Sequence, residues 1–141
     1  MRLIFVDTSF FYAHAYERDA HHLEAVKFLE HLPASLITTN FVFDELITIL
    51  RYDFGHEIAA KYGGYLRESN VCTIARLLIK DEEAAWRFFL KYDDQDFSFT
   101  DCTSFAFMQR VGIKEAAAFD AHFDVAGFVR LPAAPPGKRK R

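Results

Sequence analysis

The chain opens with a continuous apolar run, Leu3 to Val6, in which polar and apolar positions do not alternate. Such a run is typical of a strand that is covered on both faces, as in a parallel sheet between two layers of helices. Further strands are predicted later in the chain, the last of them at an edge of the sheet before Pro132: residues 35–39, 71–75, 116–119 and 128–131.

Longer stretches between these runs carry apolar residues at the spacing of a helix. The predicted helices cover residues 20–32, 40–54, 56–68, 80–92 and 98–111. We expect Asp19 to cap the first helix and Pro33 to end it, while Gly55 and Gly112 end two later helices. Strands that alternate with helices predict a single α/β domain with a parallel sheet of four or five strands flanked by helices. In such sheets ligands bind outside the carboxyl ends of the strands.

Length and composition fit one folded domain. The 141 residues are 51% hydrophobic and include 16 Phe, which is too apolar for a disordered chain and too interrupted by charge for a membrane span. We expect a folded domain at residues 1–132 and a disordered basic tail at 133–141. The first apolar run is too short for a secretion signal, and Cys72 and Cys102 have no zinc-site spacing, so we expect a cytoplasmic protein with reduced thiols.

The body of the chain is acidic. Without the terminal residues 138–141, 13 basic residues face 20 acidic ones, a net charge of −7. Broad nucleic-acid binding depends on a basic surface. The charge therefore counts against it, unless bound cations offset the acidic residues where phosphates would bind.

Two carboxylates follow predicted strands directly. Asp7 comes after the first strand and Asp120 after the fourth, so both would project from the carboxyl edge of the sheet. For either residue alone, a helix cap or an Asx turn is the favoured explanation.

Glu45 lies on the apolar stripe of its predicted helix, three residues after Val42 and four before Ile49. A charge there needs a partner, which could be an arginine or a metal ion. The neighbouring Asp44 falls on the outer side of the helix. Glu45 is therefore the third candidate for the site.

Asp101 stands three residues after Ser98, which is the spacing of a capping box at the start of a helix. Capping alone would explain Asp101, but a capping carboxylate can also face a cation. Four carboxylates at one edge of a sheet cannot all stay ionised without cations. Oxygen-rich sites of this kind suit Mg²⁺ or Mn²⁺, and their commonest use is phosphoryl chemistry.

The ordered set of these motifs resembles the PIN domain, specifically the VapC-type toxin ribonucleases. The resemblance rests on the following segments and spans the chain to about Pro132: Val6-Asp7-Thr8-Ser9, Glu45, Ser98-Phe99-Thr100-Asp101, Phe119-Asp120-Ala121-His122-Phe123 and Gly127-Phe128.

The resemblance implies an endoribonuclease that depends on Mg²⁺ or Mn²⁺, cuts RNA, is blocked by a small antitoxin protein and forms a homodimer. Asp7 and Asp101 match the principal metal ligands of the family, and Glu45 and Asp120 match its other acidic positions. The remaining matches are hydroxyls that orient water or carboxylates: Thr8, Ser9 and Ser98.

Other interpretations stay open at this point. A phosphate-handling or regulatory Mg²⁺-binding domain without nuclease activity would need a lysine after a late strand, whereas Lys114 precedes one. A PIN-like binding module without activity would not need all four acidic positions. We expect a structural role for His122 before a phosphate contact, and a surface or helix-face position for His21. Most aromatic residues are expected in the core or at a dimer surface rather than in a base-stacking position.

Overall fold

A computed structural model describes residues 2–32 and 34–133 of the chain. Over these residues the strands form one five-stranded, fully parallel sheet in the order β3-β2-β1-β4-β5. The strands are β1 (Leu3–Val6), β2 (Ser35–Thr39), β3 (Cys72–Ala75), β4 (Glu115–Ala117) and β5 (Val129–Leu131). The predicted α/β class and the parallel sheet are therefore confirmed.

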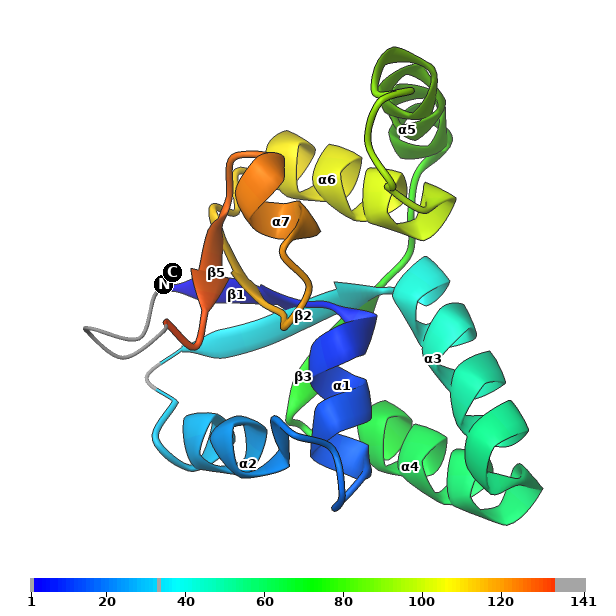
Figure 1. Ribbon diagram of the computed structural model, residues 1–141, viewed down its shortest axis with the longest axis vertical. Helices are drawn as coiled ribbons and strands as arrows, with labels where there is room; N and C mark the ends of the chain where they lie inside the picture. The colour runs from blue at the N-terminus through cyan, green and yellow to red at the C-terminus, as the bar shows by residue number, and fades with distance from the viewer. Residues whose placement is uncertain (1, 33, 134–141) are drawn as a thin grey trace.

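Helices cover both faces of the sheet (Figure 1). The helices over the described residues are α1 (Thr8–Ala15), α2 (His22–Glu30), α3 (Asn40–Phe54), α4 (His56–Glu68), α5 (Ile79–Lys91), α6 (Phe99–Val111) and α7 (His122–Val125). Figure 1 shows α1, α2 and α4 on one side of the sheet and α6 and α7 on the other, with α5 beyond the end of α6. From β1 to β3 the chain moves toward one edge of the sheet, and after β3 it moves toward the other edge. Because each crossover is right-handed, the connecting helices change to the other face at that point.

Most predicted helices are found within a residue or two, but two helices were missed. Helix α1 buries Thr8, Phe10, Phe11 and Ala13, so its apolar residues do not form one clear stripe. Helix α7 has only four residues. The prediction that Asp19 caps this helix was also wrong. The cap residue of α2 is His21, and the Asp19 carboxylate accepts the His21 N–H at 2.8 Å, before the helix begins.

The fourth strand ends earlier than predicted. Strand β4 stops at Ala117, two residues before the expected end, because the Phe119 N–H donates to the Ser9 side-chain oxygen at 3.0 Å instead of continuing the ladder. The Asp7 N–H donates to the Ala117 carbonyl at 3.0 Å. These two bonds fasten the turn after β4 to the turn after β1.

The core lies on both faces of β1 and is rich in aromatic rings. Phe5 packs against Phe107 and Phe123, with ring centroids 6.1 and 6.2 Å apart. Residues 101–108 of α6 are all buried, so this helix crosses the sheet as an internal element. Cys102 is fully buried and burial raises its pKa to about 11, as expected of a packing thiol. Helix α6 therefore carries Asp101 on a rigid support.

Two remaining expectations concern the ends and surfaces of the chain. No helix among residues 2–32 and 34–133 has the length and apolarity needed to cross a membrane. The predicted basic tail falls almost entirely on residues 134–141, which lie outside the described residues.

Candidate active site

A pocket of about 520 Å³ opens at the carboxyl edge of the sheet. Its lining residues come from the turn after β1, from α1 and the segment between α1 and α2, from α3, from the loop before α6 and the start of that helix, and from the turn after β4 and the start of α7: Asp7, Thr8, Ser9, Tyr12, Asp19, His21, Glu45, Ile49, Asp53, Asp96, Ser98, Asp101, Phe119, Asp120 and His122. All seven residues singled out in the sequence thus meet at one pocket, while their chemical roles stay a prediction.

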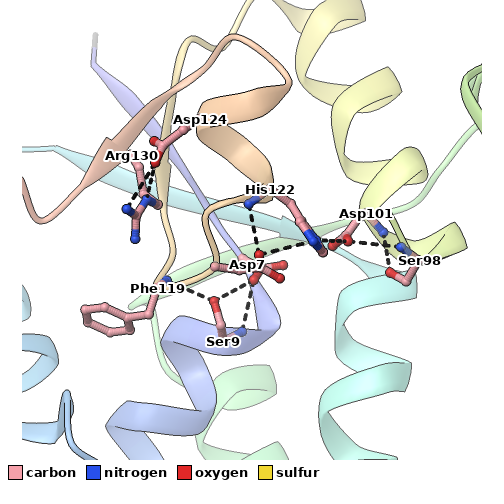
Figure 2. A network of polar contacts seen from close by, with 9 residues as sticks. Asp7, Ser9, Ser98, Asp101, Phe119, His122, Asp124 and Arg130 are labelled. Atoms are coloured by element: carbon pink, nitrogen blue, oxygen red, sulfur yellow. Dashed lines mark hydrogen bonds and ion pairs between the residues drawn. The ribbon is translucent and has the colours of Figure 1, made fainter. Parts of the chain in front are cut away.

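Asp7 sits at the base of the pocket and is almost completely buried. It caps α1: its carboxylate accepts the Ser9 N–H at 3.1 Å and the Ser9 hydroxyl at 2.6 Å. Figure 2 shows Ser9 between Asp7 and the Phe119 backbone, so one hydroxyl links both strand ends. The cap expected of Asp7 and its place in the pocket therefore occur together.

Burial raises the pKa of Asp7 to about 7. The Ser9 hydroxyl stabilises the charged form, but the nearby carboxylates of Asp101 and Asp120 oppose it. A carboxylate in this position gains from any cation that enters the pocket.

Asp101 caps its helix, and its negative charge is only partly compensated. Its carboxylate accepts the Ser98 N–H at 3.1 Å, and its own N–H donates to the Ser98 side-chain oxygen at 3.0 Å, so the predicted capping box is present. Burial raises the pKa of Asp101, while the His122 ring and the Ser98 N–H hold the charged form in part. The two expected readings of Asp101 are compatible.

His122 joins the two outer carboxylates. Its Nδ1 lies 2.9 Å from Asp101 Oδ2 (Figure 2). The same atom lies 3.2 Å from Asp120 Oδ1. Asp120 also accepts the His122 N–H at 2.9 Å, which is the Asx-type bond expected after the strand. One ligand atom from each of Asp101, Asp120 and His122 can be chosen so that all three lie within 4.8 Å of one another. His122 therefore orients these two carboxylates. The sequence predicted a structural role for His122 but not the residues that it contacts.

Glu45 points from α3 toward the start of α1. Its Oε1 accepts the Thr8 hydroxyl at 2.6 Å. No arginine pairs with Glu45 in the part of the chain that the structure describes, so the alternative of an arginine partner does not hold there. Asp44 is exposed on the outer side of α3, as predicted.

The pocket gathers negative charge, and the basic side chains among its described lining residues are His21 and His122. Seven carboxylates line it, and no Lys or Arg does so among the described residues. Carboxylate oxygens with one imidazole form a donor set that suits Mg²⁺ or Mn²⁺. The residues present therefore fit a divalent cation.

The other eight lining residues were not predicted as part of the site: Tyr12, Asp19, His21, Ile49, Asp53, Asp96, Phe119 and His122. Asp53 could have been found, because it continues the helical spacing of Glu45 and Ile49. Tyr12 could not, because helix α1 was missed. Its hydroxyl donates to Asp53 at 2.6 Å and closes the pocket on the side of α3.

Comparison with known proteins agrees with this geometry. A family model described as the PIN domain matches residues 4–129. Over 129 residues the chain is 39% identical to the 23S rRNA-specific endonuclease VapC20 from two strains of Mycobacterium tuberculosis, covering 92% of this chain and 98% of the relative.

A solved structure gives the same relationship in space. The crystal structure of Mycobacterium tuberculosis VapC20, described as a Sarcin-Ricin loop cleaving toxin, superposes with a TM-score of 0.84 at 39% identity. The match covers 89% of this chain and 96% of that chain. The chain therefore belongs to the PIN domain family, among the VapC-type proteins.

Proposed function

We propose that this chain is a metal-dependent endoribonuclease that hydrolyses phosphodiester bonds of RNA and acts as the toxin of a toxin-antitoxin pair. The observation that carries the proposal is the pocket at the carboxyl edge of the sheet, where seven carboxylates meet without a lysine or arginine among the described residues. Its VapC relatives, which include an rRNA-specific endonuclease, support RNA as the substrate class.

Asp7, Glu45, Asp101 and Asp120 would hold one or more Mg²⁺ or Mn²⁺ ions. When bound, such ions lower the pKa of water and neutralise charge on the reacting phosphate. Ser9 and Thr8 fix the carboxylates of Asp7 and Glu45 through short hydrogen bonds, and Ser98 fixes Asp101. These contacts give the site a geometry that is set before substrate binds.

His122 has a positioning role in this proposal. Its ring contacts Asp101 and Asp120 at once, so it holds two ligands from different elements in a fixed relation. The alternative of a phosphate-handling or regulatory Mg²⁺-binding domain finds no support, because Lys114 is exposed and precedes β4, at the opposite edge of the sheet.

We propose ribosomal RNA as the substrate, since the VapC20 relatives act on 23S rRNA. An RNA substrate would place the activity in the cytoplasm. The test is incubation of the purified protein with total RNA, with and without Mn²⁺, followed by sequencing of new 5′ ends. New ends in 23S rRNA that require Mn²⁺ are expected, whereas intact RNA at all metal concentrations would refute the nuclease.

The partner proposed is a small antitoxin that inserts a basic side chain among the carboxylates, because a guanidinium satisfies carboxylate oxygens with paired hydrogen bonds. Expression of the chain alone should slow host growth, and Asp101→Ala should relieve the effect. Harmless expression of the wild-type chain in several hosts would refute the toxin function and leave the nuclease function standing.

A homodimer is part of the same proposal, and light scattering would measure its mass against the 16.3 kDa of one chain.

A further inference from the structure

Three aromatic rings from different segments form a parallel stack at the rim of the pocket. Phe10 of α1 stacks on Phe119 with centroids 5.7 Å apart and planes 8° apart. His21 stacks on Phe119 with centroids 4.3 Å and planes 7° apart. Phe28 of α2 meets Phe10 edge-on at 5.6 Å, so the inner end of the stack is anchored in the core.

The stack is tied to the active site through Phe119. This residue directly precedes Asp120, and its N–H donates to the Ser9 hydroxyl that also binds Asp7. Figure 2 shows the Phe119 ring on the side of Ser9 that faces away from His122 and Asp101. His21, which stacks on Phe119, lines the same pocket as Asp7 and Asp120, so a group resting on it would border the carboxylates.

His21 forms that outer end and is held in place. Its N–H donates to Asp19 at 2.8 Å, and its Nδ1 lies 3.0 Å from Glu24 Oε1. Its side chain is 48% exposed, and among the described residues only Phe119 supplies a ring against it. One face of the imidazole is therefore packed, and the exposed remainder borders the pocket.

The acidic lining makes such a surface useful. Around seven carboxylates, phosphate contacts made by the protein itself are unfavourable, and no lysine or arginine among the described lining residues offsets them. Stacking of a base on an aromatic ring needs no net charge and is a common way to hold unpaired RNA. It would supply substrate affinity that the charge of this face does not.

We infer that His21, backed by Phe119 and Phe10, is a stacking site for one unpaired RNA base next to the bond that is cut. The inference rests on the proposed nuclease function and adds a substrate contact to it. The sequence predicted a surface or helix-face position for His21 and no base-stacking role for most aromatic residues. In the structure His21 is exposed and Phe10 is fully buried, and Phe119 stacks on both rings.

The test is cleavage kinetics with Mn²⁺ on a short single-stranded RNA that contains the mapped cut site. His21→Ala should lower kcat/KM about ten-fold, mainly through KM, whereas His21→Phe should stay within about two-fold of wild type. His31→Ala is the matched control, since His31 is an exposed histidine just after α2 that does not line this pocket. Thermal melting checks that each variant is folded.

Substrates with one base removed at a time locate the contact. In the wild-type protein, one abasic position beside the cut should cost about ten-fold, and the same position should cost His21→Ala nothing further. Equal losses in His21→Ala and His21→Phe, or an abasic profile that His21→Ala leaves unchanged, would overturn the stacking site while cleavage continues. Absence of cleavage by the wild-type protein would instead refute the proposed function, and the stacking site with it.

Discussion

Asp81 and Asp101 have the same local position but opposite electrostatic surroundings. Each is the third residue of its helix, α5 or α6, is buried, and accepts the N–H of the residue before the helix. Burial by itself would raise the pKa of both. Arg110 donates two hydrogen bonds to Asp81, at 2.6 and 3.0 Å, and holds its pKa below the usual value, whereas the pKa of Asp101 stays raised.

The difference separates a structural carboxylate from one available to a ligand. A capping bond satisfies a backbone amide, but it leaves the charge of the carboxylate only partly compensated. Asp81 obtains a full counter-charge from the neighbouring helix and fastens α5 to α6. Asp101 has only a shared histidine and faces a pocket of other carboxylates. The missing counter-charge, rather than the cap, marks the candidate site.

The largest effect expected from this comparison is on activity. Asp101→Asn keeps an oxygen for the cap but loses a metal ligand, so kcat for RNA cleavage should fall about 10³-fold, equivalent to several kcal/mol of transition-state stabilisation. Asp81→Asn is the matched control because it alters the same helix position outside the pocket. Its kcat at saturating RNA should equal that of the wild type at a temperature where both are folded. Comparable losses in the two variants would break the distinction.

The sequence predicted those parts of the fold that local patterns determine. The run from Leu3 to Val6 is a parallel strand that is buried from Ile4 on, and the end of α6 at Gly112 follows from a left-handed residue with φ 80°. Helix α1 was missed because it is buried on several sides and lacks a clear apolar stripe. Its start coincides with Asp7, so the cap was visible while the helix was not.

The site was predictable where a carboxylate followed a strand or interrupted an apolar stripe. Asp7 and Glu45 are of this kind. The contact of His122 with Asp101 was not predictable, because it joins α7 to a residue 21 positions earlier in the chain. The stack of His21 on Phe119 likewise depends on how the turn before α2 meets the turn after β4. Contacts of this range are set by the assembled sheet rather than by local sequence.

Stability against pH should also distinguish the two kinds of aspartate. When EDTA keeps the protein free of metal ions, burial raises the pKa of Asp7 from 3.8 to about 7 in the folded state. The folded state then binds more protons than the unfolded state between these values, so this group makes the protein less stable as pH rises through that window. The slope is about 1 kcal/mol per pH unit. Asp81, with its lowered pKa, has the opposite sign and loses stability only in acid.

Urea unfolding of wild type and Asp7→Asn in EDTA, from pH 4 to pH 8, measures the contribution of Asp7. The variant should gain stability relative to the wild type as pH rises, and Mn²⁺ should stabilise the wild type more than the variant above pH 7. Parallel pH curves for the two proteins would contradict a buried, uncompensated Asp7.

A smaller loss is expected when the counter-charge of Asp81 is removed. Arg110→Met leaves the Asp81 carboxylate buried without its partner, and the free energy of unfolding should fall by about 2 kcal/mol, between the values for exposed and buried pairs. Cleavage by the folded variant should be unchanged, because neither residue lines the pocket. Chemical denaturation and cleavage rates at low temperature separate the two effects. A loss of activity in the folded variant would show that the α5–α6 junction also shapes the site.

The smallest effect concerns Glu45, a carboxylate that is compensated by a hydroxyl rather than by a cation. Its Oε1 accepts the Thr8 hydroxyl at 2.6 Å and the side chain borders the pocket, while Asp44 beside it is exposed outside the pocket. Glu45→Gln keeps an acceptor for Thr8 and removes one charge from a cluster of seven, so kcat/KM should fall about ten-fold, less than for Asp101→Asn because a single outer charge is lost. Asp44→Asn removes the same charge one residue away and should leave kcat/KM unchanged. Measuring both at several Mn²⁺ concentrations decides the role: a loss in Glu45→Gln that high Mn²⁺ reduces is expected of a metal ligand. A loss independent of Mn²⁺ would leave Glu45 as a residue that only positions Thr8.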